Sequence, residues 1–240
     1  MPISFVGSAF NSAAGGADVT LTLPAALAND LIVVAYAIGD NDSAAFNTAM
    51  VTAGYTEVVD IDNTTDAEDS YLGVFWKIHN GSETEAVVDG LGGADASVAA
   101  VCMVFRGVDT TTPMDVTATS ATGIDSANPD PPSIDWTTAN TWTVCIGASA
   151  HLQAAEQTYT FPTGYTTNAV DDSQTATETT FCTVGMGYNT APSDPENPGA
   201  MTHSTTAATN SWCAATLALR EQQAGSAIQR FGRLSLLGTG

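Results

Sequence analysis

Short apolar runs separated by polar turns dominate the chain and predict an all-β fold. The runs are rich in Val and Thr, the β-branched residues that fit a pleated surface. Gly, Asn, Asp and Pro clusters separate them, and no segment carries the 3.6-residue apolar stripe of an amphipathic helix. We therefore predict an antiparallel β-sandwich or jelly roll with less than about a tenth helix. The expected strands are 3–6, 18–23, 31–38, 56–61, 71–78, 85–89, 98–106, 141–148, 166–170, 181–188 and 211–219.

An internal repeat relates the two halves of the chain. The series 29–36 (NDLIVVAY), 54–56 (GYT), 72–78 and 98–106 is followed in the same order by 140–147 (NTWTVCIG), 164–166 (GYT), 181–187 and 212–220. Each half offers only four clear strands, which is few for a sandwich of its own, although two tandem sandwiches are an alternative. We expect one sandwich whose two sheets mix strands from both halves, with 110–136 as the crossover.

The charge divides the chain into a body and an arm. The body, 1–221, with repeat halves 25–110 and 136–221, holds all 26 acidic residues and three of the five basic ones, a net charge of −23. The segment 222–240 holds two basic residues and no acid, and it is too short to bury its own apolar side chains. We interpret it as an extended C-terminal assembly arm whose partner-binding residues are Ile228, Arg230, Phe231, Arg233, Leu234, Leu236 and Leu237.

The acidic balance also limits the partners. Nucleic acids and anionic membranes attract clustered Lys and Arg, which a chain with a formal charge of −21 lacks. The chain begins without a basic region followed by an apolar one, so we expect no signal peptide, and no apolar run is long enough to span a bilayer.

The cysteines Cys102, Cys145, Cys182 and Cys213 each lie inside an apolar or Thr-rich run. We expect four buried free thiols that act as small hydrophobes, with one or two disulfides as the alternative. The spacing disfavours a cysteine zinc site.

No catalytic constellation stands out, and we expect neither an enzyme nor a cofactor. The chain lacks a G-x-S-x-G, an H-E-x-x-H and a phosphate-cradling glycine loop. His79, His151 and His203 are far apart in the sequence. His151 has Glu156 nearby and would suit a general base, but no nucleophile is marked for it.

Two other groups of residues have both a structural and a functional interpretation. The acids between 60 and 69 would suit Ca²⁺ chemically, but Thr65 stands where an EF-hand requires Gly, and we expect a solvated loop with no metal. Trp136 and Trp142 would suit a carbohydrate site, although core filling is the expected role. Tyr55 and Tyr165 occupy equivalent Gly-Tyr-Thr turns and are expected to cover the ends of the sandwich.

Residues 25–220 resemble a β-sandwich domain that recurs in tailed-bacteriophage virion proteins and related bacterial proteins. The family pattern "G-D-L-L-V-A", "G-W-T", "W-Y-K" and "R-G-V-D" is matched here by NDLIVVA from Asn29, GYT from Gly54, FWKI from Phe75 and FRGVD from Phe105. Asn29 replaces the usual Gly and Tyr55 the usual Trp. These motifs describe strands and turns, so they indicate the fold more directly than the function.

The resemblance implies a non-enzymatic structural protein located in a phage virion. Its partners would be other virion proteins, such as the major capsid protein or tail proteins, and copies of itself. We expect a capsid decoration (cement) protein; a tail or fibre component and a carbohydrate-binding surface module are the alternatives.

Overall fold

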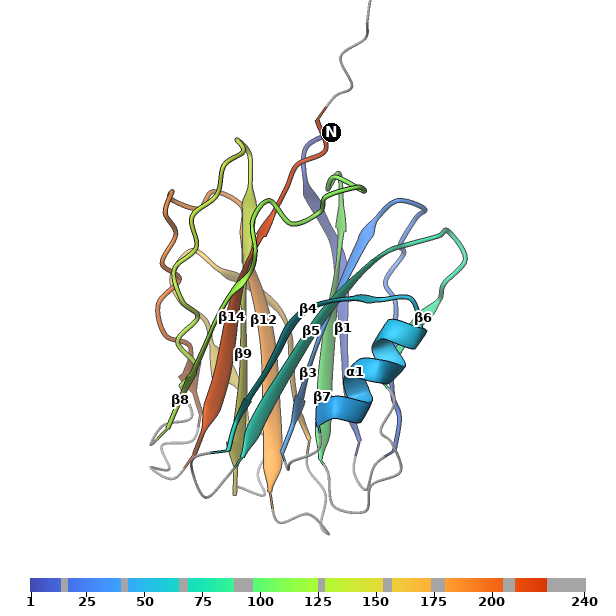
Figure 1. Ribbon diagram of the computed structural model, residues 1–240. Helices are drawn as coiled ribbons and strands as arrows, with labels where there is room; N and C mark the ends of the chain where they lie inside the picture. The colour runs from blue at the N-terminus through green and yellow to red at the C-terminus, as the bar shows by residue number, and fades with distance from the viewer. Residues whose placement is uncertain are drawn as a thin grey trace, which may run out of the picture.

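In its described residues the protein is a β-sandwich of two five-stranded antiparallel sheets, with two additional two-stranded sheets and one helix (Figure 1). The computed structural model describes residues 1–13, 17–39, 43–64, 69–88, 97–124, 128–152, 157–173, 180–204 and 210–223, with the backbone alone for 43–46 and 167–173. The prediction of an all-β sandwich is confirmed.

The first sheet is built entirely from the first half of the chain. Its antiparallel strand order is β1 (Ser4–Ala13), β7 (Val98–Arg106), β3 (Leu31–Ile38), β5 (Ser70–Ile78) and β4 (Thr56–Asn63).

The second sheet is built entirely from the second half, and its strands follow an equivalent order. They are β8 (Thr119–Gly123), β14 (Trp212–Leu219), β9 (Trp142–His151), β12 (Phe181–Asn189) and β11 (Thr166–Ser173). The repeat is therefore also a repeat of topology, with β3 matching β9 and β7 matching β14.

The prediction that the two sheets mix strands from both halves is wrong. Consecutive strands tend to pair with near neighbours along the chain, because short connections are the easiest to form. Here β4 pairs with β5 and β11 with β12. The segment 107–118 leads from β7 to β8 and so passes from one sheet to the other. The predicted crossover, 110–136, also contains the unforeseen strand β8.

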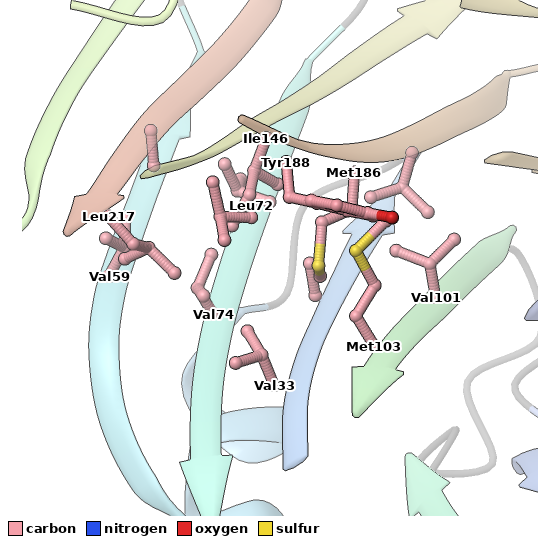
Figure 2. Packing of buried hydrophobic residues seen from close by; sticks show 14 of the residues in the cluster. Val33, Val59, Leu72, Val74, Val101, Met103, Ile146, Met186, Tyr188 and Leu217 are labelled. Atoms are coloured by element: carbon pink, nitrogen blue, oxygen red, sulfur yellow. The ribbon is translucent and has the colours of Figure 1, made fainter. Parts of the chain in front are cut away.

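The inner faces of the two sheets form one apolar core (Figure 2). Successive residues of a strand point to opposite faces, so alternate positions of each strand enter this core. Val33 on β3 and Val144 on β9 occupy matching places in the repeat, and neither has any exposed surface. Other members of the core are Leu72, Val74, Val101, Met103, Ile146, Met186, Tyr188 and Leu217.

The outer face of the first sheet carries a second apolar cluster. Its cover consists of the helix α1 (Ser43–Thr52) and the paired strands β2 (Val19–Thr22) and β6 (Glu85–Val88) (Figure 1). The sheet contributes the large side chains of this cluster, among them Tyr36 and Phe75, whose rings stack with centroids 5.8 Å apart. The helix was not predicted, and it has no charged residue and only a weak amphipathic pattern.

The outer face of the second sheet is polar although it is buried. It presents the side chains of Thr143, Ser149, Thr183 and Thr216, none of which has exposed surface. Its cover includes the segment 128–134 and the paired strands β10 (Tyr159–Thr160) and β13 (Thr202–His203).

The aromatic side chains on this face come from the cover and lie over glycines of the sheet. A Cβ added to Gly185 would lie 2.6 Å from Cδ2 of Tyr159 and 3.0 Å from Cζ of Phe161. On the first sheet the arrangement is reversed, because the large rings there belong to the sheet itself.

Candidate functional site

The structure describes residues 221–223, which form the root of the expected arm. The seven predicted partner-binding residues lie outside the described residues, so their prediction remains untested: Ile228, Arg230, Phe231, Arg233, Leu234, Leu236 and Leu237. The described residues define the surface around the root.

The root is held by backbone hydrogen bonds to two other parts of the chain. Glu221 forms a bridge with Val108, and the amide of Gln222 donates to the carbonyl of Gly107 at 2.8 Å. The amino group of Met1 donates to the carbonyl of Gln222 at 2.9 Å. Gln222, the first residue of the expected arm, is therefore bonded to the body.

Gly107 makes this crowded junction possible. Its φ of +81° lies in the left-handed region, which L-residues with a side chain rarely adopt. A Cβ at this position would also collide with the carbonyl oxygen of Pro2. The N-terminal segment and the root thus meet at a site that tolerates only glycine.

A hollow of about 370 Å³ opens on one side of the root. Met1 and Leu27 expose 64% and 58% of their surface beside it, while Asn29, Asp30, Arg106 and Thr110 make the rest of the lining largely polar. Its lining also includes Gln222 itself.

An ion pair forms part of this lining. Arg106 donates from Nε to Oδ1 of Asp30 at 2.9 Å and from Nη2 to Oδ2 at 2.7 Å, a two-pronged geometry that fixes both groups. These hydrogen bonds from Arg106 to Asp30 raise the pKa of the guanidinium. Because Asp30 also accepts from the amide of Leu27 at 2.8 Å, the pair holds the exposed Leu27 in place.

A second hollow of about 370 Å³ also adjoins the root, at Glu221. It is lined by Pro2, Ile3, Asn140, Trp142, Thr190 and Glu221. The ring of Trp142 stacks on Tyr188, with centroids 5.5 Å apart, and meets Phe105 edge-on at 6.4 Å. The Trp142 ring therefore packs against the inner core as well as lining the hollow.

Trp136, the other residue considered for carbohydrate binding, is half-buried next to a pair of carboxyl groups. A hydrogen bond with Asp135 raises the pKa of Asp194, because it favours the protonated form of one of the two carboxyls. Tyr55 and Tyr165 are buried at equivalent positions after Gly54 and Gly164, both of which have positive φ.

The structure brings together two of the three histidines, which the sequence had placed far apart. Nε2 of His151 lies 3.0 Å from Oγ1 of Thr183, and Nε2 of His203 lies 3.1 Å from the same atom. The imidazole centroids are 5.3 Å apart, and the hydroxyl of Tyr159 donates to Ser149 at 2.6 Å alongside them. This group is buried beneath the cover of the second sheet, so we assign it a structural role.

His79 lies in the turn between β5 and β6, where its Nδ1 accepts from the amide of Gly81 at 3.0 Å. Glu156, the carboxylate considered as a partner of His151, lies outside the described residues.

The acidic stretch 60–69 is only partly a loop. Asp60 and Asp62 lie on β4, and Oδ1 of Asp60 accepts from the hydroxyl of Tyr71 at 2.8 Å. Asp66 and Glu68 lie outside the described residues. Among the residues that the structure describes, no three His, Cys, Asp or Glu residues are grouped to hold a metal ion.

All four cysteines are buried free thiols, as predicted. Burial raises the pKa of the Cys102 thiol to about 11 and that of Cys213 to about 12. Because the thiolate is the reactive form, these groups are inert in the folded state at neutral pH.

Comparison with known proteins finds no matching family model, no matching curated protein and no matching solved structure. Among the described residues, no helix combines the length and apolar character that a membrane crossing requires.

Proposed function

We propose that this protein is a non-enzymatic structural protein of a phage virion, a capsid decoration protein whose sandwich body is attached to the shell through its C-terminal arm. The proposal combines the resemblance of residues 25–220 to virion β-sandwich domains with the placement of the arm's root. It makes other virion proteins the partners of the arm.

The observation that carries the proposal is the fixed root of the arm beside two hollows. Hydrogen bonds at Gly107 and Met1 hold Gln222 at one end of the sandwich. Because the root of the arm is fixed to the body, binding of the arm to a partner would also restrict how the body is placed on that partner. The exposed side chains of Met1 and Leu27 add a contact surface at the same end.

The charge distribution supports an attachment of this kind. The arm contains two arginines and five large apolar residues, whereas 1–221 carries a net charge of −23. Burial of the apolar side chains would contribute on the order of 1.5–3 kcal/mol each. Ordering the backbone costs roughly 1–2 kcal/mol per residue. The two terms are comparable, so stable docking requires a partner that supplies a preformed groove and hydrogen bonds.

Quantitative analysis of purified virions tests the proposal. A decoration protein is present in copy numbers that follow the capsid lattice, whereas a tail or fibre component is present in a few copies. Absence from the particle would contradict the proposal, and a low copy number would favour the tail alternative.

Truncation tests the role of the arm. The chain should end after Gln223, because removal of Glu221 and Gln222 would also remove bonds to Gly107 and Met1. We expect the truncated body to fold, as judged by its circular dichroism, and to be lost from virions. In the full chain, Phe231→Asp should reduce incorporation, while Ser235→Asp is the matched control. Full incorporation of the truncated body would place the attachment site elsewhere.

A further inference from the structure

The turn that joins β5 to β6 contains the only Asn-Gly pair of the chain, Asn80-Gly81. In such a pair the backbone nitrogen of the second residue can approach the side chain of the first, because glycine has no Cβ to obstruct it. Asn80 and Gly81 are both exposed, so water reaches them. The residues around this pair supply the two groups that a reaction between them requires.

The first group is a base on the nitrogen of Gly81. Nδ1 of His79 accepts the hydrogen of this nitrogen at 3.0 Å. Nε2 of the same ring lies 2.8 Å from the carbonyl oxygen of Glu83 and donates to it, because a carbonyl oxygen can only accept. The two contacts together select the tautomer that carries its lone pair on Nδ1, the atom that faces the Gly81 nitrogen. His79 is buried, so its surroundings hold the ring in this position.

The second group is a pair of hydrogen-bond donors on the side-chain oxygen of Asn80. Oδ1 of Asn80 accepts from the amide of Ser82 at 2.8 Å and from the hydroxyl of Ser82 at 2.7 Å. Attack on the neighbouring carbon, Cγ, moves negative charge onto this oxygen, and donors that already point at it stabilise the charge. The amide of Asn80 donates to Oε2 of Glu83 at 2.7 Å, which fixes the backbone of the turn.

We propose that Asn80 is a self-modification site, at which the folded protein converts the side-chain amide to a carboxylate. The nitrogen of Gly81 bonds to Cγ of Asn80 and gives its proton to Nδ1 of His79. The bond from Cγ to the side-chain nitrogen then breaks, and this nitrogen takes up the proton and leaves as ammonia. The product is a cyclic succinimide, which water opens to aspartate or to isoaspartate.

The modification adds a negative charge beside Glu83, whose carboxylate pairs with Lys77 at 3.1 Å. Aspartate keeps an oxygen that can accept from Ser82, whereas isoaspartate lengthens the main chain and distorts the turn. The turn is bonded to the loop that lines the first hollow, because the carbonyl of His79 accepts from the amide of Asn29 at 2.9 Å. The inference does not depend on attachment to a shell.

Peptide mass spectrometry of the full-length protein, incubated at neutral pH, measures the reaction. Asn80 should show the mass change of an amide replaced by an acid. Asn11, which is exposed on β1, should stay intact over the same period. In urea the unfolded protein should react more slowly at Asn80 than the folded protein does, because unfolding removes the base and the donors. This comparison needs no variant.

Three variants assign the roles within the turn. His79→Gln should slow the reaction of the folded protein about tenfold or more, because glutamine cannot take up the proton. Ser82→Ala removes one donor to Oδ1 of Asn80 at an exposed position and should slow the reaction about threefold. Thr84→Ala, exposed in the same turn, is the matched control and should react like the wild type.

Several results would overturn the proposal. Reaction at Asn80 that is no faster in the folded protein than in urea would show that the turn gives no acceleration. Equal rates in the wild type and His79→Gln would exclude the base. An Asn80 that stays intact in the folded protein would exclude the site.

Discussion

The outer faces of the two sheets are both buried under a cover, but one is apolar and the other is polar. Tyr36 in the first sheet occupies the position that Gly147 occupies in the second, and Phe75 corresponds in the same way to Gly187. Large rings of the first sheet therefore correspond to glycines of the second. The second sheet receives Tyr159 and Phe161 from its cover. The topology therefore determines where the space between a sheet and its cover must be filled. It does not determine whether the sheet or the cover supplies the large side chain.

The inner faces, unlike the outer faces, are apolar in both halves of the chain. Val33 and Val144 are identical, and Val74 corresponds to Met186. An inner face must match the other sheet along its whole length, whereas each outer face must match only its own cover. The constraint on the outer faces is therefore weaker, and their composition has diverged further.

The largest expected loss of stability comes from removing a large side chain from the apolar outer face. Phe75→Ala removes a fully buried ring that stacks on Tyr36, and we expect a loss of about 3–5 kcal/mol in the free energy of unfolding. Urea denaturation measures this loss. The control is Val87→Ala at a partly exposed position, and a loss below about 1 kcal/mol for Phe75→Ala would show that this cluster contributes little.

The polar outer face should be sensitive to the loss of one hydroxyl. Thr183→Val keeps the shape of the side chain but removes the oxygen that both His151 and His203 contact. We expect a loss of about 2–3 kcal/mol, because polar groups buried at this site lose a partner. Thr183→Ser retains the hydroxyl and should be close to the wild type in the same denaturation experiment; equal losses in the two variants would contradict the role of the hydroxyl.

A smaller effect is expected from adding volume beneath the second cover. Gly185→Ala places a Cβ 2.6 Å from the ring of Tyr159, so the cover must shift, at a cost of about 1–2 kcal/mol. Thermal melting with Ser120→Ala as the exposed control measures this cost. An unchanged melting temperature would mean that the cover lies more loosely than the contacts indicate.

The smallest predicted effect depends on pH and concerns the turn that precedes β9. Although partial burial opposes ionisation, hydrogen bonds from Thr137 and Thr138 lower the pKa of Asp115. A lowered folded pKa gives stability that is present above the unfolded value of about 3.9 and is lost as the pH falls through the folded value.

Asp115→Asn should therefore cost about 1 kcal/mol at pH 7 and much less near pH 2. The unfolding free energies of wild type and variant at the two pH values check this. A difference that does not change with pH would assign the effect to packing instead of charge.

The sequence predicted the strands better than their arrangement. The runs around β3 and β9 are apolar on both faces, so they predict buried central strands but do not indicate which sheet each joins. The sequence of β8, TSATG, is too short and polar to stand out. α1 was missed because an uncharged helix packed on a sheet needs no strong amphipathic pattern.

The site was less predictable than the fold. Asp30 and Arg106 are 76 residues apart, and their pairing follows only from the register of β3 against β7. The contact between Met1 and Gln222 joins the two ends of the described chain, and no local pattern signals it. The buried pair His151 and His203 likewise required the strand β13, whose two residues carry no strand signal.

The assignment of each sheet to one half has a consequence for synthesis on the ribosome. All strands of the first sheet precede residue 107, so this sheet can form while the second half is still being translated. At about 5–20 residues per second, the remaining half takes on the order of ten seconds to emerge. During that interval the inner face around Val33, Val74 and Val101 has no partner sheet. The nascent chain thus exposes an apolar surface that the finished protein buries.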